Sequence, residues 1–202
     1  PNQNSPLDYR GEILTDSDFT DVVLVEACFI QCILDGSNFE NNNCSGAQFH
    51  AARLRNANLK GAKLDEASFK MADLEDSTFD QAHGQKVDLS KASLYSSSFK
   101  EAVLPQVNFA ESDLRMCNLE NADLRGANLD GVDLAGANLT GTNLDGVRCN
   151  RTRITNTLGL SDEQREMLFA NGAYEGLPPA LNRLTLLGDE LFQKAKSQST
   201  VL

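Results

Sequence analysis

The sequence predicts an all-β solenoid, in which the chain winds as a four-sided coil with 20 residues per turn. A large apolar residue returns every five positions from Leu14 to Ile154, and Phe alternates with Leu, so the full pattern repeats every ten. Neither period matches a helix turn or the two-residue alternation of a flat strand. Unequal neighbouring units fit a closed coil with four sides, in which like units lie opposite each other. Central residues 20 positions apart would then stack in columns.

The five-residue unit is clearest over residues 122–146, which read ADLRG, ANLDG, VDLAG, ANLTG and TNLDG. The leucine is the centre of each unit, with a small residue two positions before it and glycine two positions after it. One large and one small inward side chain fill a narrow coil without a void or overpacking. Asp, Asn and Gly suit the tight turn at each corner. Of the 29 centres, only Cys44, Gly84 and Cys149 are not Leu, Phe or Ile.

Many units resemble the A(D/N)LXX pattern of the pentapeptide-repeat family: ANLKG, AKLDE, ASFKM, ADLED, ADLRG and ANLTG. The resemblance implies a right-handed quadrilateral β-helix, in which the centre and the small residue point inward and the other three residues outward. Coils about 4.8 Å apart would give about seven turns and a rod about 34 Å long. Two departures are local. Gly84 stands where a core side chain belongs, and Val23, Cys28 and Ile33 are apolar at outward positions.

The repeat divides the chain into three segments. Residues 12–156 keep the period and are expected to form the β-helix. Residues 1–11 are polar with two prolines and are expected to be an N-terminal tail, whereas residues 157–202 are expected to form a C-terminal α-helical cap. No run of about 18 apolar residues could span a membrane, and no secretory signal is visible. We therefore expect a cytoplasmic protein, with the periplasm or the thylakoid lumen as alternatives that the family resemblance leaves open.

Helix signals replace the repeat after Ile154. Ser161 with Gln164 predicts a capping box for a short helix over residues 162–171, and Gly172 predicts its end. A second amphipathic segment follows two prolines, with leucines three and four positions apart: Leu181, Leu184, Leu187 and Leu191. We interpret this segment as a cap folded over the last coil, which makes the protein a monomer rather than a homodimer. The alternative is a helix that binds a second copy or another partner.

Residues with catalytic or metal-binding chemistry are few. The two histidines, His50 and His83, are 33 positions apart and have no neighbours at the spacing of a metal site or a catalytic triad. The five cysteines form no CxxC pair, and four occupy inward positions, where a thiol acts as a small hydrophobic side chain. We therefore predict no catalytic residues, no metal, no cofactor and no enzymatic activity.

Charge is distributed unevenly along the chain. The net charge of −11 argues against direct binding of nucleic acid. The first 52 residues contain eight acids and one base, Arg10. The candidate partner-binding residues at this acidic end are Asp16, Asp18, Asp21, Glu26, Asp35 and Glu40. A basic cluster follows them: Arg53, Arg55, Lys60, Lys63 and Lys70.

These features predict a non-catalytic protein-interaction or scaffold module, a rigid rod whose regular side-chain ladders are recognised by a protein partner. The alternative comes from the family resemblance, since some members resemble duplex DNA, bind DNA gyrase or topoisomerase and protect against quinolones. About 34 Å of B-DNA would carry roughly 20 phosphate charges. This rod carries about half as many, concentrated at one end and interrupted by the basic cluster, so we favour the interaction module.

Overall fold

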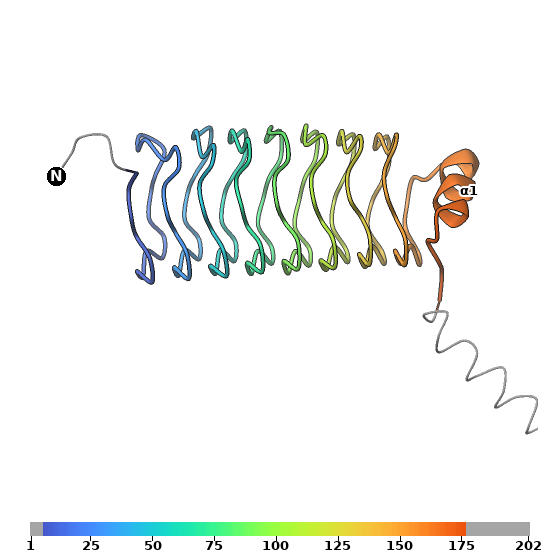
Figure 1. Cartoon of the computed structure of the whole chain (residues 1–202), viewed down its shortest axis with the longest axis horizontal. Helices are drawn as coiled ribbons and strands as arrows, with labels where there is room; N and C mark the ends of the chain where they lie inside the picture. The colour runs from blue at the N-terminus through green and yellow to red at the C-terminus, as the bar shows by residue number, and fades with distance from the viewer. Residues whose placement is uncertain (1–5, 177–202) are drawn as a thin grey trace, which may run out of the picture.

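The computed structural model describes residues 6–176, which form a rod of stacked coils with one short helix at its end (Figure 1). Parallel β-bridges join the residue before a centre to the residue 20 positions later, from Asp8 and Cys28 at one end to Asn138 and Leu158 at the other; the pair Val23 and Asn43 forms no bridge. These bridges are isolated and residues 6–176 contain no longer strand, because the chain turns after every side. Each coil therefore takes 20 residues, as the alternation of Phe and Leu predicts.

Two sets of backbone hydrogen bonds join neighbouring coils. The centre donates its N–H to the following coil, as Leu34 does to the carbonyl of Arg53 (2.7 Å). The N–H and the C=O of the residue before the centre both face the preceding coil: Arg53 accepts at its carbonyl from Leu34 and donates its N–H to the carbonyl of Cys32 (2.9 Å). At the corner, the N–H of Ala57 closes a turn onto the carbonyl of Leu54 (3.1 Å). An interior coil is therefore bonded on both sides.

The centres and the small residues fill the interior, as the pattern predicts. Rings 20 positions apart stack, with centroids 4.8 Å apart and planes 9° apart for Phe19 and Phe39. Rings ten positions apart come from opposite sides and meet edge to face, as Phe29 and Phe39 do at 5.8 Å and 88°. Leu14 was expected to be a core centre but is only partly buried, because it lies in the first coil and no described coil covers it.

The corners require a left-handed backbone at the second residue after the centre. Glycine fits there, as at Gly46 (φ +70°), but many corners hold other residues, such as Met71 (φ +60°) and Ala51 (φ +54°). This conformation costs a residue with a Cβ about 1–2 kcal/mol. The stacked backbone hydrogen bonds impose it nevertheless, which explains why the repeat tolerates corners without glycine.

Gly84 occupies a centre position for a steric reason. A Cβ on Gly84 would lie 2.6 Å from the carbonyl carbon of Leu64 and 2.8 Å from the amide nitrogen of Asp65. No side chain fits there unless the coil shifts. The small position of the next side holds the larger Val87, which is fully buried and supplies apolar volume beside the missing centre.

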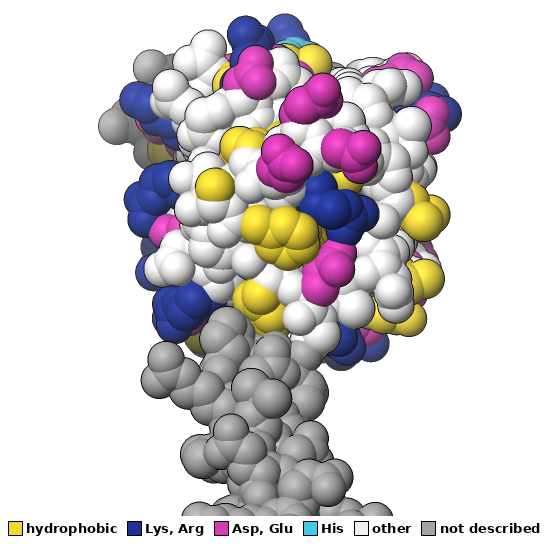
Figure 2. Space-filling view, turned by 90° about the vertical axis from the view of Figure 1, so that its right-hand side faces the viewer, with side chains coloured by type: hydrophobic (Ala, Val, Ile, Leu, Met, Phe, Trp, Pro, Cys, Tyr) yellow, Lys and Arg dark blue, Asp and Glu magenta, His cyan; other side chains and the backbone are white. Residues whose placement is uncertain are grey.

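The helix α1 (Asp162–Ala170) follows the last coil and confirms the short helix predicted from the sequence. Ser161 and Gln164 form the predicted capping box, and the C-cap is Asn171. Leu168 is fully buried, and the Gln164 side chain donates to the carbonyl of Thr142 (2.9 Å). One face of α1 therefore lies against the end of the coil. Figure 2 views this end, where acidic side chains gather beside a few hydrophobic ones.

The chain returns to the coil after α1. Tyr174 forms a parallel bridge with Arg153, accepts from the N–H of Ile154 (2.9 Å) and donates to the carbonyl of Thr152 (2.9 Å). This adds a short extra rung to the last coil. The predicted segment with Leu181, Leu184, Leu187 and Leu191 lies outside the described residues. No helix in the described part of the chain is both long and apolar enough to cross a membrane.

The other end of the rod begins earlier than expected. Asp8 already pairs with Cys28, although residues 1–11 were expected to form a tail. The cause is that Tyr9 and Gly11 donate to the carbonyls of Cys28 and Ile30 (2.8 and 3.0 Å), so the polar sequence before the clear repeat still follows its register.

Candidate interaction surface

Five of the six acids predicted to bind a partner lie along one side of the coil. With 20 residues per turn, the side centred on Phe19 and Phe39 carries Asp18 at its outward position. The two corners that bound this side carry Asp16, Asp21, Asp35 and Glu40. Glu26 lies one corner further round and does not belong to this group. The register thus brings together residues that are as far as 24 positions apart in the sequence.

Two of the six acids are half-buried and are bound by side chains of the following coil, whereas Asp18 is exposed although it also accepts a hydrogen bond from the Asn38 side chain (3.3 Å). The carboxylate of Asp35 forms an ion pair with Arg53 (2.6 Å). Glu40 accepts a hydrogen bond from the side chain of Asn58 (3.2 Å). The remaining acids are exposed and form no ion pair with any residue in the described part of the chain: Asp16, Asp18, Asp21 and Glu26. These four carboxylates are the part of the predicted set that is open to a partner.

Exposed apolar side chains surround the acids. Ile13 is 72% exposed, Val23 79% and Val25 41%. The outward position of Val23 was anticipated from the sequence, but Ile13 was not singled out. The signal was present, because Ile13 directly precedes the centre Leu14 and that position points outward in every unit. The surface at this end of the rod is therefore both acidic and apolar.

The basic cluster limits this surface. Arg55 bridges two acids of the following coil, Asp73 (2.6 Å) and Glu75 (3.2 Å). Lys60, Lys63 and Lys70 form no ion pair within residues 6–176. Negative potential is therefore strongest before residue 53 and is offset by positive charge beyond it.

The histidines and cysteines do not form a reactive group. His50 and His83 lie on different sides of the coil. All five cysteines are free; Cys28 is half-buried and the other four are buried. Burial raises the pKa of the Cys44 thiol to about 12, and it also raises the pKa of Cys117. Thiols held in the neutral form are poor nucleophiles and poor metal ligands. Among residues 6–176, no cluster of three or more His, Cys, Asp or Glu side chains could hold a metal ion.

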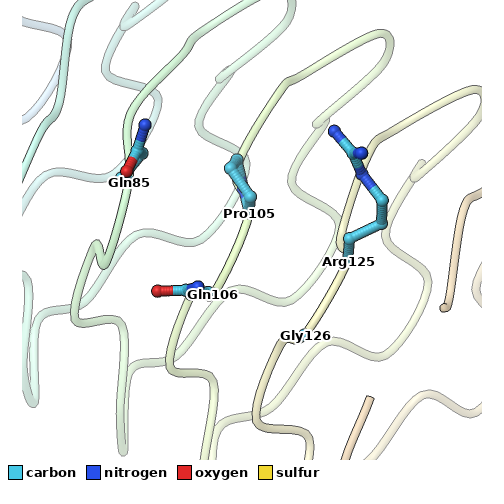
Figure 3. Close-up of a pocket in the computed structure, with 5 residues that line it drawn as sticks. All are labelled: Gln85, Pro105, Gln106, Arg125 and Gly126. Carbon is cyan, nitrogen blue, oxygen red and sulfur yellow. The ribbon is translucent and has the colours of Figure 1, made fainter. Parts of the chain in front are cut away.

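One open hollow lies at a corner of the rod, between side chains of three consecutive coils (Figure 3). Its lining consists of Gln85, Pro105, Gln106, Arg125 and Gly126. The guanidinium of Arg125 is bound to Asp123 (2.7 Å). The hollow therefore offers amide groups and a neutralised arginine, but no acid, base or nucleophile for catalysis.

Comparison with known families identifies the repeat. Residues 36–109 match the pentapeptide repeat region, and residues 12–41 and 122–158 match pentapeptide repeats. The chain belongs to the pentapeptide-repeat family. Proteins of this family form right-handed quadrilateral β-helices, which agrees with the register described above. A comparison with curated proteins returned no match.

Solved structures of pentapeptide-repeat proteins share this fold. A trypsin-treated variant of QnrB1, a plasmid-mediated fluoroquinolone resistance protein, is 17% identical with a TM-score of 0.53, over 82% of this chain and 95% of that one. HetL from the cyanobacterium Nostoc, involved in regulating heterocyst differentiation, is 22% identical with a TM-score of 0.42, over 75% and 82%. Rfr23 from the cyanobacterium Cyanothece is 27% identical with a TM-score of 0.34, over 65% and 90%. The likeness to the QnrB1 variant is one of fold.

Proposed function

We propose that this pentapeptide-repeat protein is a non-catalytic interaction module that binds a protein partner at the acidic end of its rod. The observation that carries the proposal is the side with Asp16, Asp18 and Asp21, whose carboxylates are exposed and form no ion pair with any of the described residues. Elsewhere on the rod, acids are commonly tied to an arginine of the same or a neighbouring coil, as Asp73 and Asp123 are. Carboxylates without such a partner remain available for a cationic surface.

The coil supports this role by holding the acids in fixed positions. Asp18 accepts hydrogen bonds from the N–H of Thr20 (3.1 Å) and from the side chain of Asn38 (3.3 Å). Because its own corner and the following coil restrain this carboxylate, little side-chain conformational entropy remains to be lost when a partner binds. A rigid ladder of charges favours a partner whose own charges have a matching spacing.

A charge-neutralised rod tests this function. The triple variant Asp16→Asn, Asp18→Asn, Asp21→Asn is compared with a control that neutralises three acids in the middle of the rod: Asp65→Asn, Glu66→Gln and Asp76→Asn. Proteins captured from the source cell by the native rod, the triple variant and the control are quantified by mass spectrometry. Binding of each candidate partner to each rod is then measured with purified components. We expect the partner to bind the control rod as tightly as the native rod and to show no binding to the triple variant. Equal binding to all three rods would contradict the proposal.

The second candidate function is binding of DNA gyrase as a mimic of duplex DNA. The fold likeness to QnrB1 and the exposed acids favour it. Against it, the ion pairs of Arg53 and Arg55 replace the continuous negative surface of DNA with alternating charge. A gyrase supercoiling assay with a quinolone separates the two functions. Rescue of supercoiling by the native rod would establish the mimic, and no effect at a large molar excess would exclude it.

We also propose that the segment from residue 157 onward caps the last coil and keeps the protein monomeric. The burial of Leu168 and the extra rung at Tyr174 support the cap. Light scattering on the full chain tests the oligomeric state: a mass near that of one chain is expected, and a mass of two chains would replace the cap with a dimer interface.

A further inference from the structure

The first coil leaves backbone hydrogen-bonding groups open at the outer end of the rod. In the second coil, Ile33 donates to the carbonyl of Glu12 (2.9 Å) and accepts from the N–H of Leu14 (2.7 Å). Ile13 is the equivalent of Ile33 one coil earlier, and Asp18 holds the same position on the next side of the first coil. Neither residue forms such backbone hydrogen bonds with any of residues 6–176. An N–H and a C=O side by side on a sheet edge are the groups to which an additional strand binds.

The exposed apolar side chains concentrate at the same end. Four of the large hydrophobic residues exposed on the described surface fall between residues 7 and 25: Leu7, Ile13, Val23 and Val25. Along the middle of the rod, such residues occur singly, as Met71 and Val103 do. A segment that pairs with the edge would therefore cover apolar surface as well as backbone groups, which lowers its free energy of binding.

Charge determines which segment can bind there. Asp16, Asp18 and Asp21 are exposed around the open edge and have no ion pair among the described residues. Two copies of this end facing each other would bring these acids together, and like charges in close contact oppose association. A segment with lysine or arginine would instead relieve the repulsion among the acids. The complementary occupant is therefore cationic and is not the same acidic end of a second copy.

The geometry of the coil sets the spacing of that occupant. Ile13 and Asp18 are the outward residues of neighbouring sides, five positions apart with a corner between them. A segment that pairs with both would place its own pairing residues five positions apart and turn between them. In a parallel ladder, side chains on neighbouring rungs lie next to each other, so a β-branched residue would lie beside Ile13 and a basic residue beside Asp18.

We propose that this end of the rod is a docking site for a cationic segment of a protein partner, which adds one further rung by pairing its backbone with Ile13 and Asp18. Its β-branched side chain packs on Ile13, and its lysine or arginine, five residues later, pairs with Asp18. This inference rests on the proposed function, since both place the partner at the acidic end, but it adds backbone pairing to charge recognition.

Synthetic peptides of about 12 residues test the proposal on the full chain. The probe carries valine and lysine five positions apart, with Asn-Gly at the turn between them. One control replaces lysine with glutamate. A second carries N-methyl groups on the amides of the two residues that directly follow valine and lysine, because in this register the residue after the pairing residue donates to the next coil, as Leu34 does to Arg53; this removes two donors but keeps the charge. Dissociation constants are measured by fluorescence anisotropy. Because a net hydrogen bond is worth up to about tenfold in affinity, we expect N-methylation to weaken binding about tenfold or more.

Protein variants locate the site. Ile13→Lys should weaken the probe about tenfold through lost packing and added repulsion, and Asp18→Asn should weaken it about threefold, as for an exposed ion pair. The matched controls Val103→Lys and Asp76→Asn change an exposed valine and an exposed aspartate in the middle of the rod and should leave binding unchanged. All four side chains are exposed, so the variants are expected to fold.

Three results would overturn the proposal. If the unmodified probe does not bind, the open edge is not a docking site. If the N-methylated probe binds as well as the unmodified one, charge alone is recognised, and the proposed function survives without the added rung. If Asp18→Asn leaves probe binding unchanged but makes the rod self-associate, the acids serve only to keep copies apart.

Discussion

Replacing Phe99 with alanine tests whether the coils are held together by their stacked centres. Phe99 is fully buried, stacks on Phe79 with ring centroids 4.7 Å apart and meets Phe109 edge to face at 5.6 Å. Truncation of a buried Phe costs about 3–5 kcal/mol, and each lost aromatic pair contributes about 0.5–1.5 kcal/mol of that. The hydrogen-bonded coils on both sides cannot collapse into the cavity. We therefore expect the upper half of the range.

Two variants serve as controls for this experiment. Lys100→Ala, one position further along, removes an exposed ion pair with Glu120 (3.2 Å) and should cost less than about 1 kcal/mol. Phe99→Leu should cost clearly less than Phe99→Ala, because Leu59 and Leu119 already occupy the same column. Urea unfolding followed by circular dichroism gives the three changes in stability. Equal losses for Phe99→Ala and Lys100→Ala would show that the inward register is wrong.

Three further predictions concern thiols, the irregular unit and pH. With a thiol reagent, the native protein should react quickly only at Cys28, because Cys44 and the other buried thiols have raised pKa values; rapid labelling of more than one thiol would contradict their burial. Gly84→Ala should destabilise the fold by about 1–3 kcal/mol through backbone clashes alone, because Gly84 does not have a left-handed φ; an unchanged stability in urea melts would refute the steric argument. A hydrogen bond from the Arg125 guanidinium lowers the pKa of Asp123 below its ordinary 3.8, so this carboxylate stabilises the fold above that pH, and the contribution is lost as the pH falls through the lowered pKa. Asp123→Asn should therefore reduce the loss of stability as the pH falls below 3.8, and an unchanged acid titration would refute this reasoning.

The register of the coil could be predicted from the sequence because every unit repeats the same pattern of inward and outward residues. Each centre and each small residue marks an inward position, so single departures such as Asn42 do not shift the register. Asn42 is buried at a small position, where its side chain donates to the carbonyl of Val22 (2.9 Å). The capping box at Ser161 was equally readable, because it is a local pattern of two side chains and two backbone groups.

Other features depend on contacts between coils and could not be read unit by unit. The pairing of Asp35 with Arg53 spans 18 positions and removes one acid from the predicted surface. The reason for glycine at position 84 lies in the backbone path of Leu64 and Asp65 in the preceding coil. The open groups of Ile13 and Asp18 follow only from counting hydrogen bonds in the first coil. Sequence patterns identify what points outward, whereas the structure is needed to show which outward groups are already bonded.

The rung at Tyr174 also lies where a second rod would have to join this one. A parallel coil has a direction along its axis, so the open backbone groups of its last turn are complementary to the open groups of its first turn. Copies could therefore join head to tail without closing into a ring. Arg148 of the last coil lies in the same column as Asp8 of the first, so even the charges of such a joint would be compatible. Tyr174 already occupies the carbonyl of Thr152 and the N–H of Ile154, so a second rod could not pair with these two groups. If the proposed cap keeps the protein monomeric, loss of these residues is expected to favour an open filament.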